Sequence, residues 1–242
     1  LMTLWACEAY KRLNPKTDIF FYCAKQYLDI PKMSRAITKA IDVTFYPHFG
    51  KQLIGYPIEA EDYPNRPMSK HLVEYFGAEL GLDSKDVWGK WKLHCPKTDV
   101  KHPYITIQPK TGWSPYKEWP FVRWQEVVDA IKAKYPKYTL VQIGASEDPV
   151  LAGCIKPNVP ISEAISLVAN ARLHLGGDSF ANPVRGIVGG PAVILWGSTS
   201  PIGSGYKTSI NIWHNMEHAC SPCYREYPKM SRHPKPHCPH CD

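Results

Sequence analysis

The sequence lacks long apolar runs. Its apolar segments, such as residues 192–196, stop far short of the roughly 20 residues that a helix needs to cross a bilayer. The beginning of the chain also lacks the basic, then apolar, then small order of a signal peptide. No internal repeat or low-complexity segment is visible. These absences predict a chain without a transmembrane segment.

The composition is that of an ordinary globular protein. With 44% hydrophobic and 21% charged residues, the chain differs from disordered, collagen-like and coiled-coil proteins. Its 242 residues allow one large domain or two small ones. Acidic residues are in deficit, because 22 Asp and Glu stand against 29 Lys and Arg, for a formal net charge of +7. That surplus suits an anionic ligand, such as a phosphate-bearing molecule or a lipid surface, and does not by itself indicate nucleic acid.

Four of the eight cysteines form two Cys-x-x-Cys pairs near the end of the chain, separated by fourteen residues. Four thiolates at this spacing can surround a zinc or iron ion tetrahedrally, so the pattern favours a metal site, with disulfides as the alternative. Four protein ligands leave no place for substrate. The candidate ligands are Cys220, Cys223, Cys238 and Cys241, whereas the scattered Cys7, Cys23, Cys95 and Cys154 are predicted to be buried thiols of a reducing compartment.

Short apolar segments alternate with amphipathic ones in the second half of the chain, which predicts an α/β fold. Such alternation implies a parallel sheet with right-handed crossovers, and ligands of these sheets bind at the carboxyl ends of the strands. Strands are expected at residues 104–108, 138–143, 173–175 and 192–196, and helices at 122–134 and 161–171.

The first half of the chain predicts another α/β lobe, with a helix at 1–13, a strand at 18–23 and a helix at 69–80. We therefore expect a first lobe at residues 1–100, a second at 101–205 and a metal-binding tail at 206–242.

Polar turns follow the first two strands of the second lobe. The first turn holds Thr111, Gly112 and Lys117 ahead of a helix, and its hydroxyl, backbone N–H and ammonium donors suit a phosphate group, although many such loops are merely polar turns. Glu147 follows the second strand. A carboxylate there can accept the two hydroxyls of a ribose, or simply cap a helix.

Two motifs carry further information. Gly177, Asp178 and Ser179 follow the third strand, where Asp and Ser also make good helix N-caps. After them come Gly-Gly-Pro at 189–191 and an apolar strand that ends in Gly-Ser-Thr-Ser-Pro at 197–201; the second motif is Lys-Glu-Trp-Pro at 117–120. In type and spacing these motifs resemble those of the family-9 glycosyltransferases, the ADP-heptose:lipopolysaccharide heptosyltransferases and their relatives.

This resemblance implies a GT-B architecture, with two Rossmann-like lobes that hold the acceptor and the sugar nucleotide respectively. It implies inverting transfer of a sugar such as heptose, from a donor such as ADP-heptose to a lipopolysaccharide-core or protein acceptor, without a catalytic metal. Position by position, the Thr111 and Gly112 loop and Lys117 would hold the diphosphate, Glu147 the ribose, and Gly177, Asp178 and Ser179 the donor sugar or its phosphate. Lys117 and Asp178 are the catalytic candidates.

The sequence departs from the family pattern in several places. Pro183 stands where members commonly have a histidine, Arg185 where small residues are usual, and Phe180 where glycine is common. The family's glycine-rich loop and its aspartate, the usual candidate for the general base, are expected upstream of Leu1 and are absent from the sequence. These departures keep open a catalytically inactive protein that binds sugar nucleotides or scaffolds an assembly.

The four-cysteine tail resembles the C-terminal finger of heptosyltransferases that modify bacterial autotransporters. That resemblance implies a structural metal that helps assembly, and hence a homo-oligomer. It also implies a cytoplasmic location, with peripheral attachment at the inner membrane as an open alternative. A zinc-ribbon protein that binds nucleic acid would explain the tail and the charge but not the three polar turns, so nucleic acid is not an expected partner.

We predict one equivalent of bound zinc or iron in the purified chain. Cys220→Ser removes one of four thiolate ligands and should abolish stoichiometric binding, because three thiolates hold the ion less tightly. Elemental analysis of both proteins measures this directly, with Cys154→Ser as the matched control. Absence of metal from both samples would contradict the assignment.

Overall fold

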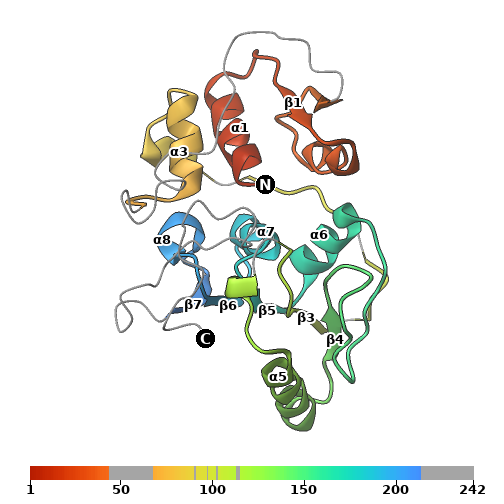
Figure 1. Cartoon of the computed structure of the whole chain (residues 1–242). Coiled ribbons are helices and arrows are strands. Elements are labelled where there is room, and N and C mark those ends of the chain that lie inside the picture. The colour runs from red at the N-terminus through yellow and green to blue at the C-terminus, as the bar shows by residue number, and fades with distance from the viewer. Residues whose placement is uncertain (44–67, 90, 97, 102, 113–114, 214–242) are drawn as a thin grey trace. The chain divides into compact units, whose positions relative to one another are not determined.

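The computed structural model describes residues 1–43, 68–89, 91–96, 98–101, 103–112 and 115–213 (Figure 1). The chain divides into two compact units. The first comprises Leu1–Lys97, Pro160–Ser166 and Ile202–Ser204, and the second comprises Thr98–Val159, Leu167–Pro201 and Gly205–Asp242.

The first unit is built on a short parallel strand pair and two packed helices. Strands β1 (Phe20–Cys23) and β2 (Lys39–Asp42) run parallel, and helix α1 (Met2–Leu13) packs against α3 (Leu72–Glu79). The helices and the strand expected in this region are thereby confirmed. Its remaining described elements are η1 (Lys25–Tyr27), η2 (Pro31–Met33) and α4 (Ser84–Val87).

Trp88 of this unit is partly exposed and packs against the buried rings of Trp5 and His71. The ring of Trp88 meets Trp5 edge-on at 5.3 Å and His71 at 4.9 Å between centroids. His71 also begins α3, since its side chain accepts the backbone N–H of Val73. Burial lowers the pKa of His71 to about 4, so this imidazole is neutral at physiological pH.

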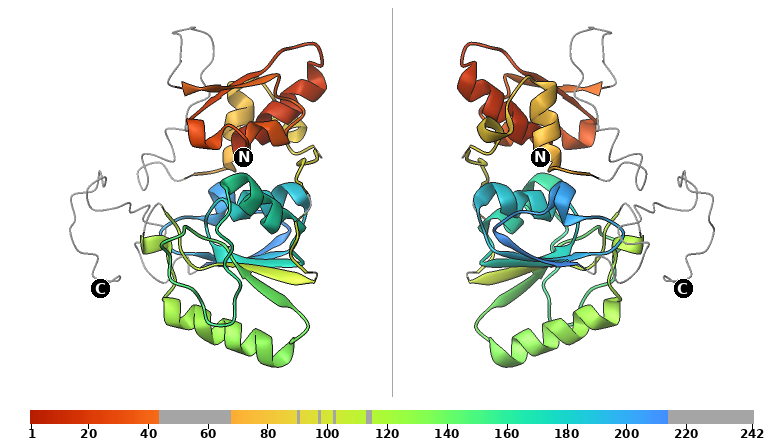
Figure 2. Two further views of the ribbon diagram at one scale, coloured as in Figure 1. Left: turned by 90° about the vertical axis from the view of Figure 1, so that its right-hand side faces the viewer. Right: turned by 90° about the vertical axis from the view of Figure 1, so that its left-hand side faces the viewer.

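The second unit is a five-stranded, fully parallel sheet in the order β4-β3-β5-β6-β7. Helix α5 lies on one face, and α7 lies on the other (Figure 2). All four strands expected here are present. The sequence did not predict β7. Its elements are β3 (Tyr104–Gln108), η4 (Pro115–Lys117), α5 (Phe121–Lys134), β4 (Thr139–Gln142), β5 (Leu173–Gly177), α7 (Ala181–Val188), β6 (Ala192–Trp196) and β7 (Ser209–Trp213). Helices α6 (Ile161–Asn170) and α8 (Pro201–Ser204) are divided between the two units.

One continuous apolar cluster packs α5 against the sheet. Alternate residues of each strand point to this face, and those of the central strands are almost fully buried. The cluster explains why the strand segments read as apolar runs. Its buried members are Ile105, Ile107, Trp124, Val128, Leu140, Leu151 and Leu175.

On the opposite face, a buried cation is held by backbone carbonyl groups. Arg185 of α7 is 2% exposed, and its Nη1 donates to the carbonyl oxygens of Val168, Ala169 and Ala171 at 2.9, 3.1 and 3.0 Å. These carbonyls close the C-terminal end of α6, where the helix dipole is negative. Burial lowers the pKa of Arg185 to about 10. The arginine that departs from the family pattern therefore caps a helix.

His174 of β5 makes the stability of the fold depend on pH. The imidazole is fully buried beside Thr106, with 3.0 Å between Thr106 Oγ1 and His174 Nδ1, and burial lowers its pKa to about 3. An unfolded histidine binds a proton near pH 6.5. The unfolded state therefore gains protons first as the pH falls, and stability decreases between pH 6.5 and 3.

We predict that His174→Gln reduces this acid sensitivity. Between pH 7 and pH 5 the free energy of unfolding should fall by about 2 kcal/mol less in the variant than in the native chain, at about 1.4 kcal/mol per pH unit below 6.5. Urea unfolding at both pH values measures the difference, and an unchanged denaturant slope serves as the control. Equal pH dependence in the two proteins would contradict this role.

Candidate functional site

The carboxyl ends of β3 and β5 define the candidate site. From β3 the chain crosses to β4 on one side, whereas β5 lies on the other side of β3. In parallel sheets, ligands bind in the crevice at this change of direction. The turn after β3 and the residues after β5 lie at this edge, so the topology brings together the two segments that the sequence marked as candidates for phosphate and sugar.

An ion pair joins these two segments. Lys117 Nζ lies 2.8 Å from Asp178 Oδ2, and the side chains are only 10% and 14% exposed. Thr199, which follows β6, donates its hydroxyl to the same carboxylate oxygen at 3.0 Å. Three turns that are distant in sequence therefore converge on Asp178. The sequence included Thr199 in a motif but assigned it no contact.

The backbone at this edge is closely packed. A Cβ atom on Gly177 would lie 3.1 Å from the carbonyl oxygen of Lys117 and 3.3 Å from Thr111 Cγ2, so only glycine fits without displacing the turn. The backbone N–H of Ser198 donates to the carbonyl of Tyr116 at 3.0 Å. These contacts hold the Lys117 turn against the ends of β5 and β6.

A second ion pair organises the turn after β3. Glu118 accepts the backbone N–H of Thr111 at 2.9 Å through Oε1, and Lys110 Nζ lies 2.5 Å from Oε2. Thr111 is buried, and the neighbouring Gly112 is exposed. Two donors of this turn, the Thr111 backbone N–H and the Lys110 ammonium, are thus bound to a carboxylate of the same turn, a contact that the sequence did not predict.

Ser179 and Glu147, two other predicted site residues, have different surroundings. Gln108, the last residue of β3, donates to the Ser179 hydroxyl at 2.9 Å and joins it to the site. Glu147 lies on the exposed turn after β4, and Ser146 donates to its carboxylate at 3.0 Å. Its own backbone N–H and the Ser146 hydroxyl lower the pKa of Glu147. The charge of Lys156 also favours the ionised carboxylate of Glu147.

Pro183 lies in the first turn of α7 and is buried. A proline is tolerated there because the first backbone N–H groups of a helix have no partner within the helix. Its side chain can donate no hydrogen bond, whereas a histidine at this position could. Phe180, at the N-cap of α7, makes no side-chain capping bond.

The predicted metal ligands Cys220, Cys223, Cys238 and Cys241 lie outside the described residues. Within the part of the chain that the structure describes, no group of three or more His, Cys, Asp or Glu side chains could hold a metal ion. The same part contains no helix long and apolar enough to cross a membrane. Of the four described cysteines, all free thiols, Cys7 is buried and the other three are half-buried.

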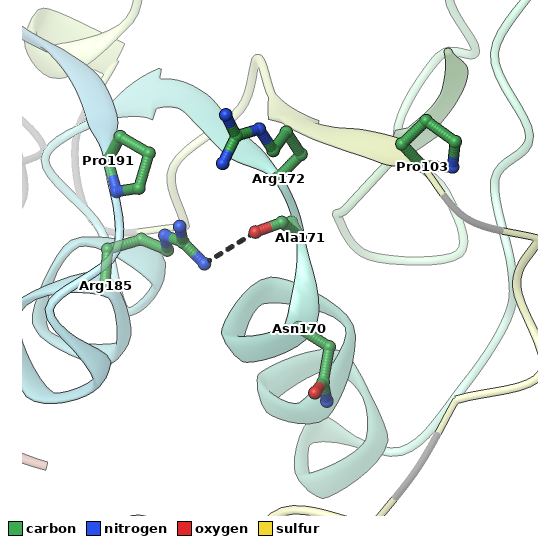
Figure 3. A pocket seen from close by; sticks show the side chains of 6 residues that line it. All are labelled: Pro103, Asn170, Ala171, Arg172, Arg185 and Pro191. Atoms are coloured by element: carbon green, nitrogen blue, oxygen red, sulfur yellow. Dashed lines mark hydrogen bonds between the residues drawn. The ribbon is translucent and has the colours of Figure 1, made fainter. Parts of the chain in front are cut away.

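A cavity of about 440 Å³ lies at the opposite edge of the sheet, next to the amino ends of β3, β5 and β6 (Figure 3). None of the sequence-predicted site residues lines it. Its wall includes the Arg185 guanidinium, which points to the carbonyl of Ala171. The lining residues are Pro103, Asn170, Ala171, Arg172, Arg185 and Pro191.

Comparison with known proteins gives a family match. Residues 64–233 match the model of glycosyltransferase family 9 (heptosyltransferase). No curated relative matches the sequence.

Several solved structures share the fold. TibC, an iron-containing dodecameric glycosyltransferase from enterotoxigenic E. coli H10407, is 18% identical with a TM-score of 0.66, over 90% of this chain and 59% of that one. E. coli ADP-heptose LPS heptosyltransferase II is 14% identical with a TM-score of 0.62, over 87% and 86% of the two chains. E. coli heptosyltransferase WaaC with ADP is 14% identical with a TM-score of 0.63, over 87% and 88%. This chain thus spans less than two thirds of TibC and has the α/β fold of heptosyltransferases.

We predict that Asp178→Asn destabilises the chain by about 3 kcal/mol, because it leaves the Lys117 ammonium buried without a counter-charge. The single variant Lys117→Met and the double variant complete the comparison. The double variant should lose less stability than the two single variants lose together, because it contains neither charge. Urea unfolding measures all three. The exposed pair of Arg123 and Glu126 provides the control, because Glu126→Gln should cost less than about 1 kcal/mol. Additive effects of the two site variants would contradict the coupling.

Proposed function

The chain belongs to glycosyltransferase family 9, and from that premise we propose that it transfers a sugar, such as a heptose, from an ADP-sugar donor to a lipopolysaccharide-core or protein acceptor. The observation that carries the proposal is the convergence of Lys117, Asp178 and Thr199 where the sheet changes direction. Structures of TibC with ADP-D-β-D-heptose and of WaaC with ADP support the choice of donor.

Lys117 is the group that acts on the leaving diphosphate. When the bond between sugar and phosphate breaks, negative charge develops on the diphosphate, and a fixed ammonium stabilises that charge more than it stabilises the bound substrate. Helix α5 begins four residues later, at Phe121, and its N-terminal N–H groups add to the positive potential. No metal is needed for this step.

Asp178 is a positioning residue in this proposal. Its Oδ2 atom already accepts from Lys117 and Thr199, so the carboxylate orients the lysine instead of removing a proton. Gly177 and Ser179 flank it and face the donor sugar. Thr111 and Gly112 contribute to the diphosphate site, and the exposed carboxylate of Glu147, whose charge also attracts Lys156, accepts the ribose hydroxyls.

In the same proposal the chain is a GT-B enzyme in which residues 1–100 form the acceptor-side lobe and 101–205 the donor lobe. Because Ser209–Trp213 form β7 of the donor sheet, the metal finger begins later than the expected residue 206 and contains Cys220, Cys223, Cys238 and Cys241. Its four thiolates can bind zinc or iron, and the similarity to the iron-containing TibC supports the choice of iron. The metal stabilises the finger and its assembly with other copies, a role supported by the dodecameric state of TibC.

A second candidate function is binding of the nucleotide sugar without transfer. Pro183 favours it, because a buried proline cannot supply the hydrogen bond of the histidine that family members commonly have there. Under this reading the site holds the donor while the chain supports an assembly.

Calorimetric titration of the full chain with ADP tests the donor assignment. Lys117→Ala should weaken ADP binding about tenfold, as expected for the loss of a charged hydrogen-bond donor. Lys134→Ala, which removes the same charge from the far end of α5, should leave binding unchanged and is the matched control. Binding of a short oligonucleotide but not of ADP would overturn the proposal.

Release of ADP from ADP-heptose in the presence of lipopolysaccharide-core acceptor distinguishes transfer from binding alone. The transferase proposal predicts release that depends on acceptor. ADP-heptose binding without release, with both core glycolipid and acceptor protein supplied, would favour the second candidate.

A further inference from the structure

Two lysines of the proposed diphosphate site are paired with carboxylates before any ligand arrives. The pairs are Lys117 with Asp178 at 2.8 Å and Lys110 with Glu118 at 2.5 Å. Two positive and two negative charges sum to zero. A diphosphate therefore gains little attraction from this arrangement unless one of the carboxylates moves away.

The two pairs differ in how firmly they are held. The Lys117 and Asp178 side chains are 10% and 14% exposed, and Thr199 provides a third contact. In the second pair Glu118 is equally buried, at 15% exposed, and has a third contact in the Thr111 N–H, but Lys110 is 39% exposed. A pair that reaches solvent is screened and exchanges partners at low cost, whereas separating a buried pair is expensive.

Glu118 also binds the backbone N–H of Thr111 at 2.9 Å. One carboxylate oxygen thus accepts from a main-chain amide while the other meets an ammonium group. Phosphate oxygens accept from the same kinds of donor, and backbone N–H groups followed by a helix N-terminus are typical of phosphate sites. Glu118 holds the two donors in the geometry that a phosphate needs.

We propose that Glu118 is an internal competitor of the donor diphosphate: its carboxylate occupies Lys110 and the Thr111 N–H in the empty site and yields both to a phosphate when the donor binds. This inference rests on the proposed donor site. It makes Glu118 a residue that sets donor affinity and promotes release of the nucleotide product, because the carboxylate returns to its two partners as the product leaves.

Isothermal titration of the full chain with inorganic pyrophosphate and with ADP tests this inference. Glu118→Gln removes the competing charge, so both ligands should bind about fivefold more tightly than to the native chain, in line with the loss of one partly screened charge interaction. Glu126→Gln is the matched control. It removes the same charge from the exposed Arg123 pair on α5 and should leave both affinities unchanged.

A second variant, Glu118→Asp, distinguishes the effect of the carboxylate's direct contacts from the effect of its negative charge at a distance. The shorter side chain keeps its charge but cannot reach Lys110 and the Thr111 N–H together, so it too should bind pyrophosphate more tightly than the native chain. This variant also serves if Glu118→Gln does not fold, which near-UV circular dichroism reveals.

Each outcome is decisive. Equal or weaker pyrophosphate binding by Glu118→Gln, or by Glu118→Asp if the first variant does not fold, means that Glu118 organises the turn for the ligand, and overturns the inference. Absence of pyrophosphate binding to the native chain also overturns it. Pyrophosphate binding that strengthens in these variants, with no binding of ADP, upholds the inference and overturns the proposed donor.

Discussion

A single ion pair holds the candidate site of the second unit together. Lys117 comes from the turn after β3 and Asp178 from the end of β5, and the 2.8 Å contact joins these two segments where the sheet changes direction. Gly177 allows that closeness because it has no side chain to separate the two segments. Parallel pairing of β3 with β5 is the prior condition, since it places both carboxyl ends at one edge.

The position of the site could be predicted from sequence because it depends on local signals. Apolar runs marked the buried strands, and glycine followed by Asp178 and Ser179 marked the end of one of them. In a parallel sheet such ends share an edge whatever the details of packing. The general arrangement therefore followed from the alternation of strands with helices and from the spacing of the motifs.

The contacts of the site could not be predicted in the same way. That Lys117 pairs with Asp178, and Glu118 with Lys110, depends on the path of the turn after β3, which no residue pattern specifies. The burial of His174 depends on its neighbours across the sheet. Strand β7 escaped prediction for another reason: Ile210 and Ile212 are exposed, so the segment has no buried apolar run.

The buried Arg185 restricts how this sequence can diverge. Its guanidinium lies so close to the backbone of residue 190 that a Cβ atom there would overlap it. A side chain at position 190 would therefore push the guanidinium away from the carbonyl oxygens of Val168, Ala169 and Ala171. The constraint runs in one direction: a smaller residue at 185 leaves room at 190, so the order in which the two positions change decides whether the end of α6 loses its cap.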